Sequence, residues 1–250
     1  MKIELHRKNI HTGNLILVNA DYPYNEQVNE TDLVNVDKSA CDVLLERRAV
    51  TLLSKLMEEI NGWGQISAVS GWRSMQEQEN IYAQSLKENG SEFTQKYVAL
   101  PGHSEHQTGL AIDLALTSDN IDFIRPDFPY TGICQTFREL SSQYGFIERY
   151  PQKKESITGI AHEPWHFRYI GFPHAEIMKK NDLCMEEYIP FIKQFAYGEQ
   201  KYNFTVAQKN FSVSYLPASE AEIVCIEIAE DVSYTISGNN IDGYIITEWR

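Results

Sequence analysis

Residues 104–116 decide the fold of this 250-residue chain, and they read SEHQTGLAIDLAL. The segment 101–109 has the composition of a loop, and the residues from Leu110 to Leu116 alternate as in a half-buried strand. Asp113 shares one face of this strand with Ala111 and Ala115. Burying a carboxylate on an otherwise apolar strand is costly unless it is paired or bound to a metal. Asp113 therefore marks the face on which we expect a site.

Helix and strand patterns precede this segment. A helix is expected from about Ser39 to Ile60, followed by a short strand from Ile66 to Trp72. The sequence from Ser74 to Glu77 matches a capping box, which opens a helix running towards Asn89-Gly90. Arg73 therefore lies at a strand-to-helix corner, where its side chain can point into a cleft.

The pattern after Leu116 continues as loop, helix, strand and two helices. These elements are expected at 117–131, 135–144, 165–171, 173–180 and 183–195. Residues 1–35 are polar and irregular, and from about Gly198 the chain alternates β-forming residues with turn clusters. We therefore expect two parts, a main domain at 1–197 and a small β-rich C-terminal appendage at 198–250. The predicted fold class is α+β: a small antiparallel sheet with helices on one face, the site on the open face, and the appendage behind.

Charge and composition exclude several classes of protein. The net charge of −13 comes from 22 Lys and Arg against 35 Asp and Glu, which disfavours nucleic acid as a partner. No apolar run of about 7–15 residues follows the N-terminus, and none approaches the ~18 residues of a membrane span. We therefore expect a cytoplasmic protein without a membrane span. Its four separated cysteines indicate free thiols rather than a disulfide framework.

Five of the seven histidines lie between residues 103 and 174. The sequence His162-Glu163-x-x-His166 matches the zincin motif, in which both histidines lie on one face of a helix. Pro164 argues against a continuous helix, because proline is tolerated only in a helix's first turn. A second possible set combines His106, Asp113 and His166, with Glu163 beside them. Two imidazoles and one carboxylate leave a fourth tetrahedral position for water, as in catalytic zinc sites. An ion-paired Asp113 beside core histidines is the structural alternative.

Three separated motifs together carry a resemblance to a known family. They are Ser70-Gly71-Trp72-Arg73-Ser74, then Ser104-x-His106-x-x-Gly109-x-Ala111-x-Asp113, then Glu163-x-Trp165-His166. In this order they resemble the zinc D,D-peptidase family of VanY-type carboxypeptidases and VanX-type dipeptidases, over roughly residues 45–175. Because no membrane anchor is expected, the chain most resembles the bifunctional VanXY branch of glycopeptide-resistance enzymes. Trp72 stands where the family more often has Tyr, which is also aromatic.

The resemblance implies a role for each matching residue. It implies one zinc ion per chain, bound by His106, Asp113 and His166, with Glu163 as the catalytic base. Arg73 matches the arginine that binds substrate and stabilises the tetrahedral intermediate, and Gln78 and Ser104 fall where family members contact substrate. No Gly-x-Ser-x-Gly motif supports a serine nucleophile.

The implied reaction is hydrolysis of D-Ala-D-Ala and of the terminal D-Ala of peptidoglycan precursors, which removes the vancomycin target. The expected substrates are the free dipeptide and the muramyl-pentapeptide precursor. The loop at 117–131, with Phe123, Phe128 and Tyr130, is a candidate lid over a small substrate. The alternatives are an L-alanyl-D-glutamyl endopeptidase of phage-lysin type and a non-catalytic zinc-bearing binding domain. Glu163 and Arg73 favour an enzyme, because a structural zinc site needs neither.

Overall fold

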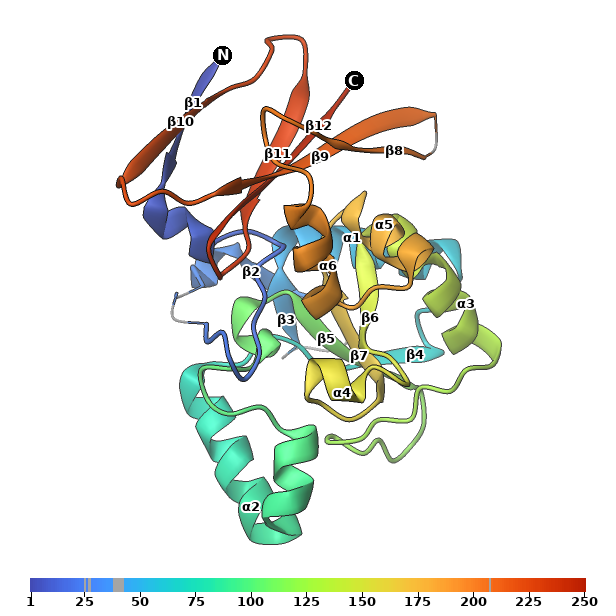
Figure 1. The fold of residues 1–250 in the computed structure, drawn as a ribbon. Helices are drawn as coiled ribbons and strands as arrows, with labels where there is room; N and C mark the ends of the chain where they lie inside the picture. Colours follow the sequence, from blue (N-terminus) through green and yellow to red (C-terminus); the bar gives the residue numbers. More distant parts are fainter. Residues whose placement is uncertain (25, 27, 38–42, 207) are drawn as a thin grey trace. The chain divides into compact units, whose positions relative to one another are not determined.

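The computed structural model describes residues 1–24, 26, 28–37, 43–206 and 208–250. The chain divides into two compact units (Figure 1): unit 1 comprises residues 1–17 and 185–250, and unit 2 comprises residues 18–184. This division differs from the boundary expected between residues 197 and 198. The difference arises because the N-terminal strand β1 (Lys2–His6) pairs antiparallel with β10 (Ile223–Glu227), so the first residues belong to unit 1.

A four-stranded antiparallel sheet forms the centre of unit 2, as predicted. Its strands lie in the order β4 (Ile66–Ser70), β5 (Ala111–Leu116), β7 (Glu163–Tyr169) and β6 (Phe146–Tyr150). The register places Asp113 of β5 opposite Ser70 on one side and opposite His166 on the other. Residues from three distant stretches of the sequence thus meet in one row across the sheet.

Helices α1 (Arg47–Glu59) and α3 (Gly132–Ser141) pack against one face of this sheet (Figure 1). Ile112 and Leu114 of β5 and Phe167 of β7 belong to the same buried cluster as Leu53 of α1 and Phe137 of α3. Because side chains alternate along a strand, Asp113, His166 and Arg168 point to the opposite face. The helices therefore cover the apolar face and leave the polar one for the site.

Helix α1 begins later than the pattern predicted. Of the expected span from Ser39, residues 39–42 lie outside the described part of the chain, and β3 (Leu44–Glu46) pairs with β2 (Leu33–Asn35) instead of being helical. The Glu46 side chain accepts hydrogen bonds from the backbone N–H groups of Arg48 and Ala49 at 2.9 and 3.1 Å. This cap sets the start of the helix, which a count of apolar residues could not locate.

Helix α2 (Met75–Tyr97) begins at the predicted capping box of Ser74 and Glu77. It is broken at Gly90, whose φ of 79° and ψ of 172° are not helical, so it forms two helical arms (Figure 1). The remaining short elements of unit 2 lie between or after its strands and longer helices. They are η2 (Glu30–Asp32), η3 (Glu105–Thr108), η4 (Ser142–Tyr144), α4 (Glu155–Thr158) and α5 (His174–Asn181).

Unit 1 is β-rich, with its own buried cluster that includes Leu5, Ile226 and Ile246. A second antiparallel sheet has the order β11 (Ser233–Gly238), β12 (Gly243–Trp249), β9 (Lys209–Pro217) and β8 (Tyr202–Val206). Unit 1 also contains η1 (Arg7–His11) and α6 (Met185–Lys193). The expectation that residues 1–35 are irregular is therefore wrong for β1 and η1. The partner strand of β1, and Asn240, which donates to the Ile10 carbonyl of η1, lie more than 200 residues away in the sequence. No local pattern could reveal these contacts.

Among the described residues, none of the helices has both the length and the apolar character needed to cross a membrane.

Candidate functional site

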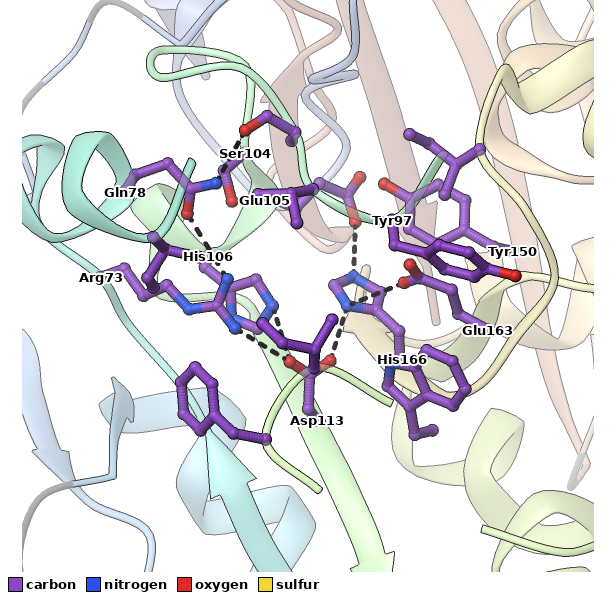
Figure 2. A pocket seen from close by; sticks show the side chains of 17 residues that line it. Arg73, Gln78, Tyr97, Ser104, Glu105, His106, Asp113, Tyr150, Glu163 and His166 are labelled. Carbon is purple, nitrogen blue, oxygen red and sulfur yellow. Dashed lines mark hydrogen bonds and ion pairs between the residues drawn. The ribbon is translucent and has the colours of Figure 1, made fainter. Parts of the chain in front are cut away.

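A pocket in unit 2 brings together all seven residues singled out in the sequence (Figure 2). They are Arg73, Gln78, Ser104, His106, Asp113, Glu163 and His166. Arg73 follows β4, Gln78 comes from α2, and Ser104 and His106 come from the start of η3. The last three come from β5 and β7. The walls between these polar groups include apolar side chains such as Ile81 and Trp165.

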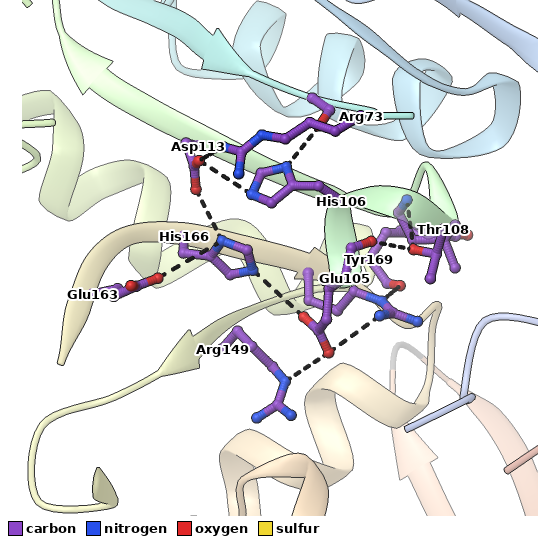
Figure 3. Close-up of polar contacts among 12 residues, drawn as sticks. Arg73, Glu105, His106, Thr108, Asp113, Arg149, Glu163, His166 and Tyr169 are labelled. Carbon is purple, nitrogen blue, oxygen red and sulfur yellow. Dashed lines mark hydrogen bonds and ion pairs between the residues drawn. The ribbon is translucent and has the colours of Figure 1, made fainter. Parts of the chain in front are cut away.

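Asp113 lies at the centre of the polar cluster (Figure 3). Its Oδ2 is 3.1 Å from a terminal guanidinium nitrogen of Arg73 and 3.2 Å from Nε2 of His106, and its Oδ1 is 2.9 Å from Nδ1 of His166. Burial alone would raise the pKa of this carboxyl, but the neighbouring His106 and His166 hold it well below its usual range. Asp113 is thus an anion at neutral pH, the form in which a carboxylate binds a metal.

His106 presents Nε2 to the cluster because its other nitrogen is already used. Nδ1 lies 2.6 Å from the carbonyl oxygen of Gly71, which can only accept, so Nδ1 carries the proton. Burial, and then the nearby Arg73 cation, lower the pKa of His106 to about 4. A neutral imidazole with a free Nε2 electron pair is a metal ligand in its binding form.

His166 faces carboxylates on both sides. Nδ1 lies 2.9 Å from Oδ1 of Asp113, and Nε2 lies 3.4 Å from Oε2 of Glu105. Burial lowers the pKa of this histidine, but the hydrogen bonds to Asp113 and Glu105 outweigh burial and raise it to about 9. In the metal-free protein His166 is therefore an imidazolium, and a metal would have to displace its Nδ1 proton.

Three buried side chains could hold a metal ion together. Each of His106, Asp113 and His166 offers one ligand atom, and these atoms lie within 4.8 Å of one another. Two imidazole nitrogens and one carboxylate oxygen are the donor set of a catalytic zinc site that keeps a position open. The arrangement therefore fits the metal set proposed from the sequence.

Glu163 lies beside this cluster without joining it, with Oε2 3.9 Å from Nδ1 of His166. Burial raises the pKa of Glu163 to about 8. The zincin alternative is wrong, because Glu163 and His166 lie on strand β7 rather than on a helix. His162 points elsewhere, with Nε2 2.7 Å from the hydroxyl of Tyr130.

Arg73 is held in place by three polar neighbours. Besides contacting Asp113, it donates from Nε to Oγ of Ser70 at 2.9 Å and from a terminal nitrogen to Oε1 of Gln78 at 3.4 Å. Gln78 in turn donates to the carbonyl of Ala99 at 2.8 Å, so both ends of its amide are engaged. Gln78 therefore contacts the Arg73 guanidinium and also lines the pocket.

Sequence reasoning missed a buried ion cluster behind the pocket. Glu105 accepts from Nε of Arg149 at 2.8 Å, and one terminal nitrogen of Arg168 lies 3.2 Å from the same oxygen. All three side chains are 0% exposed. One signal was available: Arg168 shares a strand face with His166 and would need an anionic partner if buried.

The loop 117–131 contributes two neighbouring residues, Phe123 and Ile124, to the pocket wall. Phe123 lines the pocket and lies over the Arg73 guanidinium, 5.6 Å from ring centroid to Cζ. Phe128 is instead buried in the core shared with Phe137, and Tyr130 contacts Glu148 and His162. Of the three aromatic residues proposed to cover a substrate, only Phe123 lies in the pocket wall.

Comparisons with known proteins show which family the chain is similar to. The model of the VanY family, D-alanyl-D-alanine carboxypeptidase, matches residues 42–172. The bifunctional D-Ala-D-Ala dipeptidase and D-Ala-D-Ala carboxypeptidase VanXYC of Enterococcus gallinarum is 39% identical over 181 residues, covering 72% of this chain and 95% of that protein.

Two solved structures are also similar. The vancomycin-resistance D,D-dipeptidase VanXYg, in complex with a D-Ala-D-Ala phosphinate analogue, matches with a TM-score of 0.96 and 49% identity, over 100% of this chain and 99% of that one. A mutant VanY D,D-pentapeptidase from a VanB-type resistance cassette, in complex with Zn(II), matches with a TM-score of 0.59 and 30% identity, over 70% of this chain and 98% of that one.

Proposed function

The chain belongs to the VanY family of D-alanyl-D-alanine carboxypeptidases, and on this premise we propose that it is a zinc-dependent D,D-peptidase. Its substrates are the D-Ala-D-Ala dipeptide and the D-Ala-D-Ala end of the muramyl-pentapeptide precursor. Cleaving both would remove the group that vancomycin-type antibiotics bind. The observation that carries this proposal is the buried His106–Asp113–His166 cluster, with Glu163 and Arg73 beside it in one pocket.

Three residues would hold the zinc ion: His106 through Nε2, His166 through Nδ1 and Asp113 through its carboxylate. These assignments follow from which atoms face the cluster. When bound, zinc polarises the scissile carbonyl and lowers the pKa of a water molecule towards about 7.

Glu163 is the general base in this proposal. Its carboxylate lies next to the ligand set but is not part of it. Because burial raises its pKa to about 8, Glu163 has a higher proton affinity than an exposed carboxylate. It would take the proton from the attacking water and pass it to the leaving amine, and such transfer is most efficient when the pKa lies near the working pH.

Arg73 binds the substrate and stabilises the oxyanion in this proposal. Its guanidinium is fixed by Ser70 and Asp113 before substrate arrives. Fixed donors cost no reorganisation when negative charge develops on the carbonyl oxygen. Ser104 and Gln78 complete the polar wall, and apolar residues such as Ile81 are suited to the alanine methyl groups.

The function is tested by measuring D-alanine release from the free dipeptide and from the pentapeptide precursor. We expect both activities in the zinc-loaded protein, their loss with a chelator, and recovery when zinc is restored. Release of L-alanine from an L-Ala-D-Glu peptide, with no D-alanine from either substrate, would favour the endopeptidase alternative. Zinc binding without any cleavage would favour the binding domain.

A further inference from the structure

The two histidines of the cluster use different ring nitrogens. His106 presents Nε2 to Asp113, because its Nδ1 donates to the carbonyl of Gly71. His166 presents Nδ1 to Asp113, so its Nε2 points away from the cluster. A neutral imidazole that binds a metal through Nδ1 must carry its proton on Nε2. Some group therefore has to select this tautomer of His166.

Glu105 is placed to select it. Its Oε2 lies 3.4 Å from Nε2 of His166, on the side of the ring opposite Asp113 (Figure 3). An ionised carboxylate can only accept a hydrogen bond. Facing Glu105, Nε2 must therefore be a donor. Nδ1 faces Asp113, and its proton is the one that a metal would displace.

Glu105 is held by side chains from two neighbouring strands and by a hydrogen bond within its own element, η3. Its other oxygen, Oε1, contacts Nε of Arg149 on β6 at 2.8 Å and a terminal nitrogen of Arg168 on β7 at 3.2 Å. Its backbone carbonyl accepts from the hydroxyl of Thr108 at 2.6 Å, which fixes η3 locally. The two guanidinium groups pair with Oε1, so the carboxylate is fixed with its other oxygen, Oε2, towards His166.

We propose that Glu105 is a positioning residue, which fixes His166 in the tautomer and orientation that bind zinc through Nδ1. This inference rests on the metal site of the proposed function. Carboxylate partners of metal-binding histidines typically contribute about 10- to 100-fold to metal affinity. Glu105 would act through His166 and is not itself one of the three metal ligands.

The substitution Glu105→Gln distinguishes this role from a packing role, because glutamine has nearly the same size and shape as glutamate. A glutamine amide has one accepting oxygen and one donating NH2 group. The arginine donors would take the oxygen and leave the NH2 group facing Nε2 of His166. This contact favours the opposite tautomer, in which a proton on Nδ1 occupies the position that the metal needs.

The experiment measures zinc affinity by competition with a fluorescent chelator, together with ¹⁵N NMR of the imidazole rings. We expect the wild type to bind one zinc ion, with His166 protonated on Nε2 and His106 protonated on Nδ1. Glu105→Gln should bind zinc about 10- to 100-fold more weakly and, without metal, should lack the proton on Nε2 of His166 that the wild type carries. The matched control is Glu148→Gln, because Glu148 is also a largely buried carboxylate paired with an arginine, Arg138 at 2.6 Å. The control should keep wild-type zinc affinity.

The outcomes distinguish this inference from the function on which it rests. A wild type that binds no zinc overturns the metal site itself. A wild type that binds zinc, with unchanged affinity and an unchanged His166 tautomer in folded Glu105→Gln, overturns the role of Glu105 alone. If Glu105→Gln fails to fold, the wild-type spectrum decides, because coordination of zinc through Nε2 of His166 would also overturn it.

Discussion

Asp113 shares its two oxygens between one permanent cation and two imidazoles, and this makes the pocket sensitive to single substitutions. Oδ2 faces Arg73 and His106, and Oδ1 faces His166. Removing one partner of such a buried cluster leaves the other charges uncompensated. The residues around Asp113 therefore act as a group, and their separate roles are best resolved with variants that leave Asp113 in place.

His166 and His162 give a direct test of the ligand set. His166→Ala should lose most of its zinc on dialysis, because one of three protein ligands is gone. His162→Ala should keep its zinc, since His162 contacts Tyr130 rather than the cluster. Elemental analysis of the dialysed proteins measures both. The reverse pattern would contradict the assignment of His166 as a ligand.

Glu163→Ala tests the proposed base. Since Glu163 lies outside the ligand set, the variant should retain zinc and fold. Its turnover should fall by about 10²- to 10⁴-fold, the usual contribution of a general acid or base. Steady-state hydrolysis of D-Ala-D-Ala by metal-loaded protein is the measurement. Turnover close to that of the wild type would rule out this role.

A residue's role could be predicted from the sequence when its partners were close to it in the sequence, and not when they were distant. Asp113 stood out locally, because a carboxylate interrupts an apolar strand. Glu105 lies in the same quoted stretch, yet its partners Arg149 and His166 are 44 and 61 residues away. Without a structure, nothing links these three residues, although each was visible in the sequence.

At the scale of elements, periodicity predicted three of the four strands of the central sheet in unit 2, but not β6 (Phe146–Tyr150), and it predicted element ends less accurately. The central strands β4, β5 and β7 all lie where alternation placed them, within a few residues. The start of α1 was misplaced because the Glu46 cap, not the apolar repeat, sets it. Local hydrogen bonding at a helix end is a weaker sequence signal than a buried face.

The proposed role of the loop 117–131 as a lid can be tested with a single substitution. Phe123→Ala should raise KM for the dipeptide, because Phe123 lines the pocket over Arg73. The loss should be roughly 2- to 5-fold, the equivalent of an exposed cation–π contact, and smaller for the pentapeptide, which makes contacts further along its chain. Kinetic constants for both substrates measure this difference.

Ile121→Ala is the control for the loop. Ile121 is also an exposed apolar residue of this loop but is not part of the described pocket lining. It should leave both activities unchanged. Equal loss of both activities in Phe123→Ala would argue against a lid that favours the small substrate.

At the scale of the whole molecule, the stability of unit 2 should depend on pH through His174. Burial lowers the pKa of His174 to about 3, whereas a histidine in an unfolded chain titrates near about 6.5. Between these values the unfolded chain binds a proton that the folded chain excludes. The free energy of unfolding should therefore fall as the pH decreases from about 6.5 towards 3, with no such loss above about 6.5.

His174→Gln should lower stability at pH 7 but reduce its dependence on pH across this range. Denaturant unfolding, followed by tryptophan fluorescence with chelator present, measures this, since Trp63, Trp72 and Trp165 lie in unit 2. His6→Gln is the control, because His6 is only partly buried and lies in unit 1. An unchanged slope in His174→Gln would show that other groups cause the acid sensitivity.

The pairing of β1 with β10 has a consequence for how the protein is made. During translation β1 leaves the ribosome ahead of unit 2, and β10 follows unit 2, more than 200 residues later. At roughly 5–20 residues per second, this interval is about 10–40 s. Unit 2 is continuous in sequence and can fold on the nascent chain in that time. During this interval the backbone groups of β1 lack their partner strand. Unit 1 is thus completed last. A chaperone can therefore bind β1 before its partner strand β10 has been synthesised.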